Sequence, residues 1–419
     1  MKTTGIKESV KKQLLGFCGL ATIALTSLSA SDYPTAAVST TGLAVTDTTV
    51  TVGQLHSITG TMAISETGSV EAERLAISQI NAMGGVLGRQ IKIIQEDGAS
   101  DWPTFAEKSK KLIIKDKVAC VFGCWTSASR KAVLPIFEKE NNMLYYPTFY
   151  EGLEASKNVV YTGQEATQQI IWGLDWAYEE LGARTFFLVG SDYIWPRTSF
   201  KIARKHIEDF LKKKDPKCKV VGEEYYALGH TNFRSLINKV KLKKPDLIFT
   251  AVVGGSNVAW YKQLKAAGVT SKKYNMLTIS TTEDELLGIG GENAAGFYAS
   301  MKYYQSQPNE NNKAFVAAFK EMWGKDSVIG DVTQAAYLGP WIWKAAVEKA
   351  GSFDIDKIHA AHGGIELPNA PEGYVRVHDE NQHLWSRTKI GKMLPSGQFE
   401  VVAVSDELIE PNPFPKGYQ

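Results

Sequence analysis

The feature that most constrains the fold is an alternation of apolar strand patterns and amphipathic helix patterns that begins at Thr48. The first strand pattern is "TVTVGQLHSI". The helix pattern "SETGSVEAERLAISQINAMGG" follows it, with Val70, Ile77, Ile80 and Met83 on one stripe. Further strand patterns in this half are "QIKIIQEDG", "VACVFG" and "MLYYPT". Such strand–helix units predict a parallel sheet with helices on both faces, because each parallel connection must cross over the sheet.

The same alternation restarts after "VVYTG" and fills the second half of the chain, without a sequence repeat between the halves. Its strand patterns include "TFFLVGSDY", "DLIFTAVVGG" and "YNMLTIS". A chain of 419 residues is too long for one ordinary core. We therefore predict an α/β protein with two doubly wound parallel-sheet lobes around a ligand cleft. The expected N-terminal lobe comprises residues 48–164 plus 305–365, and the C-terminal lobe comprises residues 165–304 plus 366–419.

The N-terminus has the pattern of an export signal. Several lysines precede the apolar stretch "LLGFCGLATIALTSLSA", which ends in small residues. We predict a signal peptide over residues 1–30, with cleavage after Ala30, and a flexible Ser/Thr/Ala-rich leader over residues 31–47. The protein is then exported to the periplasm. The alternative is membrane anchoring through a lipid on Cys18, although Phe17 is the wrong kind of residue for lipoprotein processing.

Composition and motifs exclude several classes of protein. The 47 Lys and Arg residues nearly balance the 45 Asp and Glu residues, which argues against a nucleic-acid partner. The lysine-rich run "FLKKKDPKCK" predicts a solvated surface. After the signal peptide, Cys120, Cys124 and Cys218 lack a disulfide or metal pattern and are predicted to fill the core. The chain has no P-loop, no G-x-S-x-G and no H-E-x-x-H, so we expect no cofactor, no metal and no catalysis.

Aromatic and hydroxyl side chains follow several of the predicted strands. In doubly wound folds a ligand binds outside the carboxyl ends of the strands, so these positions are candidate ligand contacts. A single aromatic here more often packs at the rim, and a single Ser or Thr more often caps a helix. As a group, aromatic walls with a few convergent hydroxyls and few charges suit a small, flat, polar ligand. The strand-end stretches are "HSITGT", "FGCWTSAS", "YYPTFY", "GSDYIWP", "VVGGSN" and "STTEDE".

Long blocks of the sequence resemble a known family. They include "GQLHSITGTMAISETG", "EDGASDWPTFAEK", "VFGCWTSASRKAVLPIFEKEN", "YPTFYEGLE", "FLVGSDYIWPRT" and "IGKMLPSGQFEVV". The chain resembles, from about Thr48 to its end, the urea and short-chain amide branch of the branched-chain amino acid receptor family. The resemblance implies a type I periplasmic binding protein fold. It also implies a small neutral ligand, urea or a short-chain amide, in the interlobe cleft and delivery to ABC transporter permease subunits in the membrane.

The resemblance also implies a set of ligand-binding residues. Amide-binding relatives place an aromatic and a serine after the third strand, a tyrosine and a threonine after the fourth, and a tyrosine and hydroxyls in the opposite lobe. In this chain these positions are Trp125, Ser127, Tyr146, Thr148, Tyr193, Ser280 and Thr281. We expect the planar ligand to lie flat on Trp125, with hydroxyls bonding its edges. Many urea binders carry Val-Gln where this chain has Thr148 and Phe149, which leaves urea and a small amide both open.

Two alternatives stay open at the level of sequence. The first is a receptor for guanidinium, a planar cation, which requires an acid facing Trp125. The acids considered are Glu165, Asp331 and the run 283–285, although acids that lead helices are also favoured there by the helix dipole. The second alternative is a cytoplasmic amide sensor, which would share the cleft but lack the export signal.

Overall fold

The computed structural model describes residues 29–418. The expected signal peptide and Cys18 therefore lie outside the described residues, apart from the last two positions of the predicted signal. Within residues 29–418, no helix combines the length and the apolar character needed to cross a membrane.

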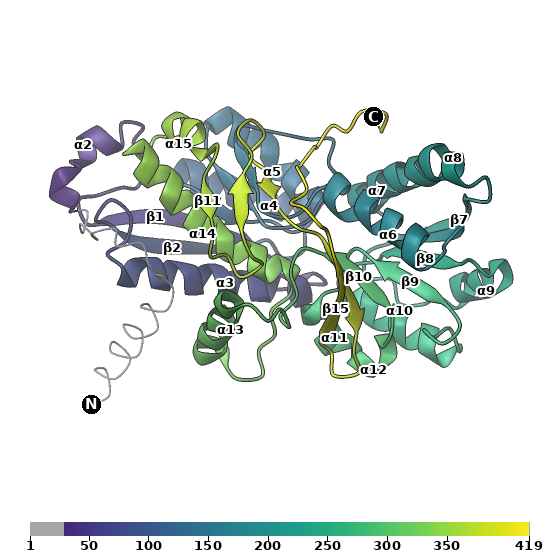
Figure 1. Ribbon diagram of the computed structural model, residues 1–419. Helices are drawn as coiled ribbons and strands as arrows, with labels where there is room; N and C mark the ends of the chain where they lie inside the picture. The colour runs from purple at the N-terminus through teal and green to yellow at the C-terminus, as the bar shows by residue number, and fades with distance from the viewer. Residues whose placement is uncertain (1–28, 419) are drawn as a thin grey trace.

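The first lobe is built on a five-stranded sheet with the order β2-β1-β3-β4-β5, and every neighbouring pair is parallel. Figure 1 shows this sheet in purple and blue, between helices on its two faces. The strands are β1 (Thr49–His56), β2 (Gln90–Asp97), β3 (Val121–Gly123), β4 (Leu144–Tyr146) and β5 (Val159–Tyr161). The main helices are α3 (Ala63–Ala82), α4 (Trp102–Lys110), α5 (Ser127–Glu140), α14 (Asp331–Ala350) and α15 (Ile355–His362).

The second lobe has a seven-stranded sheet with the order β15-β14-β10-β9-β8-β6-β7. Its parallel part runs from β7 to β10, and β14 and β15 add an antiparallel edge. The strands are β6 (Thr185–Ser191), β7 (Lys219–Tyr226), β8 (Leu247–Ala251), β9 (Asn275–Thr278), β10 (Tyr298–Met301), β14 (Lys389–Met393) and β15 (Phe399–Val404). The helices are α6 (Trp172–Glu180), α7 (Ile194–Lys205), α8 (Lys212–Lys214), α9 (Arg234–Lys243), α10 (Gly255–Ala266), α11 (Glu283–Ile289) and α12 (Gly291–Ala294). Two sheets of this kind, each with a parallel core and helices on its faces, match the predicted α/β architecture of two doubly wound lobes.

A third, small sheet lies beside the first lobe. It has the order β11-β12-β13 and reaches β5 through a bridge between Tyr161 and His383. Its strands are β11 (Glu366–Leu367), β12 (Val375–Val377) and β13 (Leu384–Trp385). The lobe boundaries given above assign residues 366–419 to the C-terminal lobe and stay a prediction. Of this segment, β14 and β15 belong to the second sheet, whereas β11 to β13 form the separate sheet.

The structure corrects the expectation that residues 31–47 form a flexible leader. This segment contains the helix α2 (Thr35–Val38) and packs on the first lobe, with Val38 buried. The buried guanidinium of Arg89 donates to the carbonyl oxygens of Tyr33 at 2.7 Å and Thr46 at 2.7 Å. A buried guanidinium needs such acceptors, and the leader supplies them. Composition alone could not reveal this contact.

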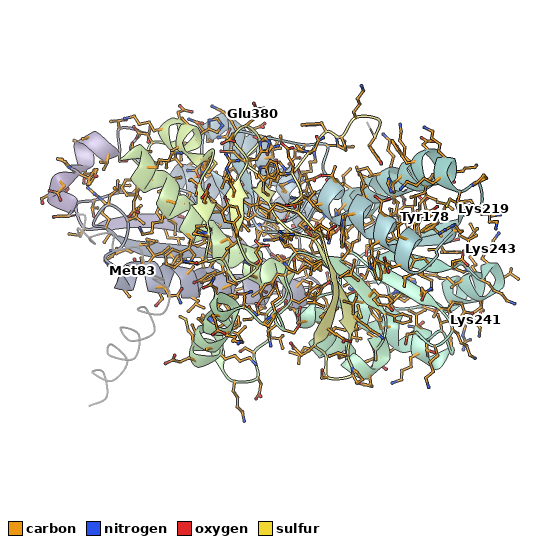
Figure 2. All side chains as sticks on the ribbon, in the orientation of Figure 1. Met83, Tyr178, Lys219, Lys241, Lys243 and Glu380 are labelled. Atoms are coloured by element: carbon orange, nitrogen blue, oxygen red, sulfur yellow. The ribbon has the colours of Figure 1, made fainter. Side chains whose placement is uncertain are left out.

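The remaining elements are short or peripheral. The lysine-rich run Lys212–Lys214 is exposed, and Figure 2 shows Lys219, Lys241 and Lys243 pointing outward at the far end of the second lobe, as expected for a solvated surface. The free cysteines Cys120, Cys124 and Cys218 are buried, as predicted. The other helical segments are η1 (Ala30–Asp32), η2 (Lys111–Lys115), η3 (Thr167–Ile171), η4 (His206–Leu211) and α13 (Glu310–Trp323).

Two buried clusters hold the molecule together. One lies under α3 and α14 on one face of the first sheet. The other begins on the opposite face, under α4 and α5, and continues without a break into the second lobe. The neighbouring residues Val121 and Phe122 fall in different clusters, because successive strand residues face opposite sides of a sheet. The second cluster therefore runs through the contact between the two lobes.

Candidate ligand-binding site

The junction between β3 and α5 places the first predicted site residues. Gly123 has φ of 146°, and a Cβ there would lie 2.0 Å from the carbonyl oxygen of Leu55, so only glycine permits this turn against β1. Thr126 caps α5 by accepting from the backbone N–H of Ala128 at 3.1 Å. Ser127 is therefore free of the capping role, and its hydroxyl donates to Glu151 at 2.5 Å.

Tyr146 and Thr148 follow the neighbouring strand β4 and lie next to this junction. The Thr148 hydroxyl donates to the carbonyl oxygen of Cys124 at 3.1 Å. Tyr146 is fully buried, and burial raises the pKa of its hydroxyl well above the usual range. Ser127 and Thr148 lie close to that hydroxyl and partly offset the rise in its pKa, yet neither completes a hydrogen bond with it. The Tyr146 hydroxyl is therefore buried without a partner.

A series of aromatic rings leads from this junction into the second lobe. The Trp125 side chain is 2% exposed, and its ring meets Phe149 edge-on at 5.5 Å between centroids. Phe149 in turn lies 5.3 Å from Trp195 at the start of α7, and Trp195 lies 6.3 Å from Tyr193. The indole N–H groups of Trp125 and Trp195 are buried without acceptors. Buried polar groups are normally paired, but Trp260, Trp341, Trp343 and Trp385 also lack an acceptor, so it is the position of these two N–H groups between the lobes that makes them candidate ligand donors.

Tyr193 completes the group. Burial raises the pKa of its hydroxyl well above the usual range, and the side chains of Tyr146 and Thr126 lie near it. The structure thus brings together five of the seven predicted residues, four from the first lobe and one from the second: Trp125, Ser127, Tyr146, Thr148 and Tyr193.

Ser280 and Thr281 lie elsewhere in the second lobe, at the end of β9. The Ser280 hydroxyl donates to the carbonyl oxygen of Val252 at 2.7 Å. The Thr281 hydroxyl lies 3.1 Å from that of Tyr261. Within the described part of the chain, no hydrogen bond or ring contact links either residue to Trp125, so their role in the site stays a prediction.

The start of α10 offers other second-lobe groups, within the strand-end stretch "VVGGSN". The Ser256 hydroxyl and both polar atoms of the Asn257 amide are buried without partners. The backbone N–H of Gly255 donates to the carbonyl oxygen of Thr61 in the first lobe at 3.3 Å. A Cβ on Gly254 would lie 2.5 Å from the side chain of Met62, so the α10 start fits closely against the first lobe.

Most carboxylate oxygens of the acids considered as partners of a cationic ligand are already hydrogen-bonded, although Oε2 of Glu283 is buried without a partner. Glu165 accepts from the N–H of Thr167 at 2.8 Å, and burial raises its pKa to about 7. Asp331 accepts from the N–H groups of Lys302 at 2.9 Å and Tyr303 at 3.0 Å, and burial raises its pKa to about 6. These contacts fit the structural interpretation of both acids at helix starts. In the run 283–285 the carboxylates bond to backbone N–H groups, to Ser65 and to neighbouring threonines.

Two buried charged groups that sequence reasoning missed lie beside the site. The first surrounds Arg130, which is fully buried. Its guanidinium donates to Glu151 at 3.0 Å and to Glu154 at 2.6 Å, and it lies over the rings of Tyr146 and Tyr150, at 4.8 and 4.5 Å. The two acids of "YEGLE", just after β4, could have suggested a buried charged group. Their partner Arg130 lies 21 residues or more away in the chain, so the sequence did not identify it.

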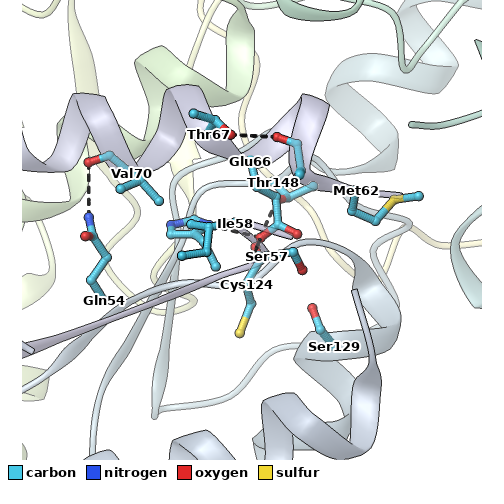
Figure 3. A network of polar contacts seen from close by, with 12 residues as sticks. Gln54, Ser57, Ile58, Met62, Glu66, Thr67, Val70, Cys124, Ser129 and Thr148 are labelled. Carbon is cyan, nitrogen blue, oxygen red and sulfur yellow. Dashed lines mark hydrogen bonds and ion pairs between the residues drawn. The ribbon is translucent and has the colours of Figure 1, made fainter. Parts of the chain in front are cut away.

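The second charged group surrounds His56, the last residue of β1. Its ring nitrogens lie 3.2 Å from Glu66 and 2.9 Å from Glu73, both on α3. Burial alone would lower the pKa of His56, but the two carboxylates outweigh burial and raise it to about 10. Figure 3 shows Glu66 with Ser57, below the helix that carries it. The sequence placed His56 at a strand end, within the stretch "HSITGT". It did not predict that Glu66 and Glu73 on the next helix contact its ring.

The balance of these charges limits what the site can bind. The two cations, His56 and Arg130, are each already paired with two carboxylates. Neither is therefore free to pair with a carboxylate on a ligand, and the surrounding acids would repel one. The unpaired aromatic N–H and hydroxyl groups suit instead a small polar ligand without negative charge.

Comparison with known proteins places this fold in a family. A family model described as a periplasmic binding protein domain matches residues 50–419. The leucine-, isoleucine-, valine-, threonine- and alanine-binding protein of Pseudomonas aeruginosa is 24% identical over 68% of this chain and 74% of its own length. A match to limonene hydroxylase of Geobacillus stearothermophilus, 31% identical, covers only 30% of this chain and 23% of that protein. That match is too partial to carry an enzymatic argument.

Solved structures agree on the fold. The solute-binding protein of an R. palustris ABC transporter in complex with 4-hydroxybenzoate superposes with a TM-score of 0.76, at 19% identity, over 86% of this chain and 98% of that one. The branched-chain amino acid transporter substrate-binding protein from Streptococcus pneumoniae in complex with isoleucine gives 0.73 at 20% identity, over 87% and 100%. The chain therefore belongs to the periplasmic binding protein domain family, a family of solute-binding receptors rather than of enzymes.

Proposed function

We propose that this receptor captures urea between its two lobes and delivers it to the permease subunits of an ABC transporter. The observation that carries the proposal is the aromatic junction of the lobes, where the Trp125 and Trp195 N–H groups and the Tyr146 hydroxyl are buried without partners. N–H and O–H groups of this kind can donate to a carbonyl oxygen. The rings that carry them provide flat apolar walls for a planar molecule.

The charges support a ligand without a carboxylate. The relatives named above bind, by their descriptions, branched-chain and other amino acids or 4-hydroxybenzoate, all of which carry a carboxylate. The buried cations of this chain are paired with Glu66, Glu73, Glu151 and Glu154, so a ligand carboxylate would meet like charge. Urea presents its carbonyl and two amino groups without net charge, and the resemblance of the long sequence blocks places it ahead of short-chain amides.

Guanidinium is a second candidate, favoured by the two carboxylates that share the single cation His56; around Arg130 the charges balance, because Lys131 also pairs with Glu154. It has the planar shape of urea but replaces the carbonyl with a third amino group, so it cannot accept from Trp125 or Tyr146. The unpaired N–H groups of the tryptophans therefore favour urea.

The test is a series of calorimetric titrations of the purified mature protein with urea, formamide, acetamide, guanidinium, leucine and benzoate. We expect urea to bind most tightly, small amides to bind more weakly, and leucine and benzoate not to bind. Tight binding of leucine or benzoate would refute the argument from charge. Tight binding of guanidinium without urea would make the protein a receptor for the cation.

A further inference from the structure

One oxygen of the Glu66 carboxylate is buried without a hydrogen-bond partner beside the site. The residue lies in the first turn of α3 and is fully buried. Its Oε2 accepts from the backbone N–H of Ser57 at 2.8 Å and lies 3.2 Å from Nδ1 of His56. Its Oε1 is equally buried and accepts nothing. A buried carboxylate oxygen without a donor is costly, so this atom calls for a functional explanation.

The position of Glu66 connects it to the site. Figure 3 shows Glu66 on α3 beside Cys124, and the pKa of the Cys124 thiol is raised by burial and by the charge of Glu66. Cys124 immediately precedes Trp125, and its carbonyl oxygen accepts from Thr148. Figure 3 shows Glu66, Cys124 and Thr148 in one polar group at the end of β1 and β3. The free oxygen therefore belongs to the strand-end junction that contains the predicted ligand platform.

The surroundings hold Glu66 in place without using that oxygen. The Ser57 N–H and the His56 ring both bond to Oε2, and Glu73 fixes the far side of the ring at 2.9 Å. Gln54 donates to the other oxygen of Glu73 at 2.7 Å, so both oxygens of Glu73 are occupied. The two acids thus share one histidine and one helix, but only Glu66 has an acceptor to offer.

We propose that Oε1 of Glu66 accepts a hydrogen bond from an N–H group of the ligand. This contact makes the receptor selective for compounds with amino groups. This inference rests on the proposed function and deepens it, because it assigns the acceptor that the amino groups of urea require. Donors such as Trp125 and Tyr146 serve the carbonyl oxygen, and Glu66 serves the nitrogen. The same carboxylate repels a ligand carboxylate.

The experiment compares Glu66→Gln with Glu73→Gln in the full mature protein. In Glu66→Gln the amide oxygen must accept from the Ser57 N–H, as Oε2 of Glu66 does. The amide NH₂ then takes the place of Oε1. It offers a donor to the ligand, which needs an acceptor there. Glu73→Gln also removes one of the two negative charges that face His56. Both oxygens of Glu73 already have partners, so this variant removes no acceptor that a ligand could use. Calorimetry gives the dissociation constants for urea, acetamide and guanidinium, and thermal melts give the stability of each variant.

We expect Glu66→Gln to weaken urea binding by about ten- to a hundredfold, the range for a hydrogen bond to a charged group, and guanidinium binding by at least as much. Glu73→Gln should change both by less than about threefold, in line with its indirect contact. Equal losses in the two variants, or no loss in Glu66→Gln, would overturn the proposal while leaving urea binding by the unmodified protein intact. A failure of the unmodified protein to bind any of the three probes would instead refute the proposed function and, with it, this role of Glu66.

Discussion

Replacement of Trp125 by alanine tests whether the tryptophan is a ligand platform or only part of the core. Its side chain is 2% exposed and packs edge-on against Phe149. Truncation of a buried tryptophan costs about 3–5 kcal/mol of unfolding free energy, which is a large part of the 5–15 kcal/mol typical of a domain. Loss of an aromatic contact at a binding hot spot costs about 1–3 kcal/mol, or about five- to 150-fold in the dissociation constant. We expect both losses in Trp125→Ala.

Trp343 provides the matched control. It is fully buried, its indole N–H also lacks an acceptor, and it lies in the other cluster, between α14 and the opposite face of the first sheet. Trp343→Ala should therefore lower the unfolding free energy by a similar amount and leave the affinity for urea unchanged. Chemical denaturation measures the first quantity and calorimetry measures the second.

The conservative change Trp125→Phe separates the two roles further. It keeps an aromatic wall and loses the indole N–H, so its stability should fall less than that of Trp125→Ala while urea binding is still weakened. If Trp125→Ala and Trp343→Ala reduce the affinity equally, the loss comes from destabilisation. An unchanged affinity in Trp125→Ala would refute the platform outright.

Three further predictions concern closure, the helix-leading acids and pH. The Phe149–Trp195 contact joins the lobes, so saturating urea should favour the closed form, and small-angle scattering should show a smaller radius of gyration than without urea; equal radii would contradict ligand-driven closure. Glu165→Gln and Asp331→Asn should leave urea and guanidinium affinities within about threefold by calorimetry, because both acids bond to backbone N–H groups; a selective loss for guanidinium would contradict this. Burial and the charge of Glu285 raise the pKa of Asp284 to about 8, so the folded state retains its proton and loses stability as the pH rises from about 4 to 8. Thermal melts across this pH range should show a smaller loss of stability in Asp284→Asn than in the unmodified protein. The same pH profile in both proteins would contradict this role of Asp284.

The order of strands and helices was predictable because it depends on local patterns. An amphipathic stripe such as that of α3, or a strand that ends in a glycine such as Gly123, is encoded within a few residues. The carboxyl ends of parallel strands meet at one edge, so the proximity of Trp125 and Tyr146 also followed from the sequence. The resemblance to a family placed Tyr193 with them.

The charged and closed character of the site was decided by the tertiary structure. The pairing of Arg130 with Glu151 depends on the loop after β4 folding back over α5, and that of His56 with Glu66 and Glu73 depends on how α3 crosses β1. A sequence shows that such acids exist, but not which cation each one meets or which oxygen is left without a donor. Those properties depend on distances between elements far apart in the chain, and only the packing of the helices on the sheets fixes them.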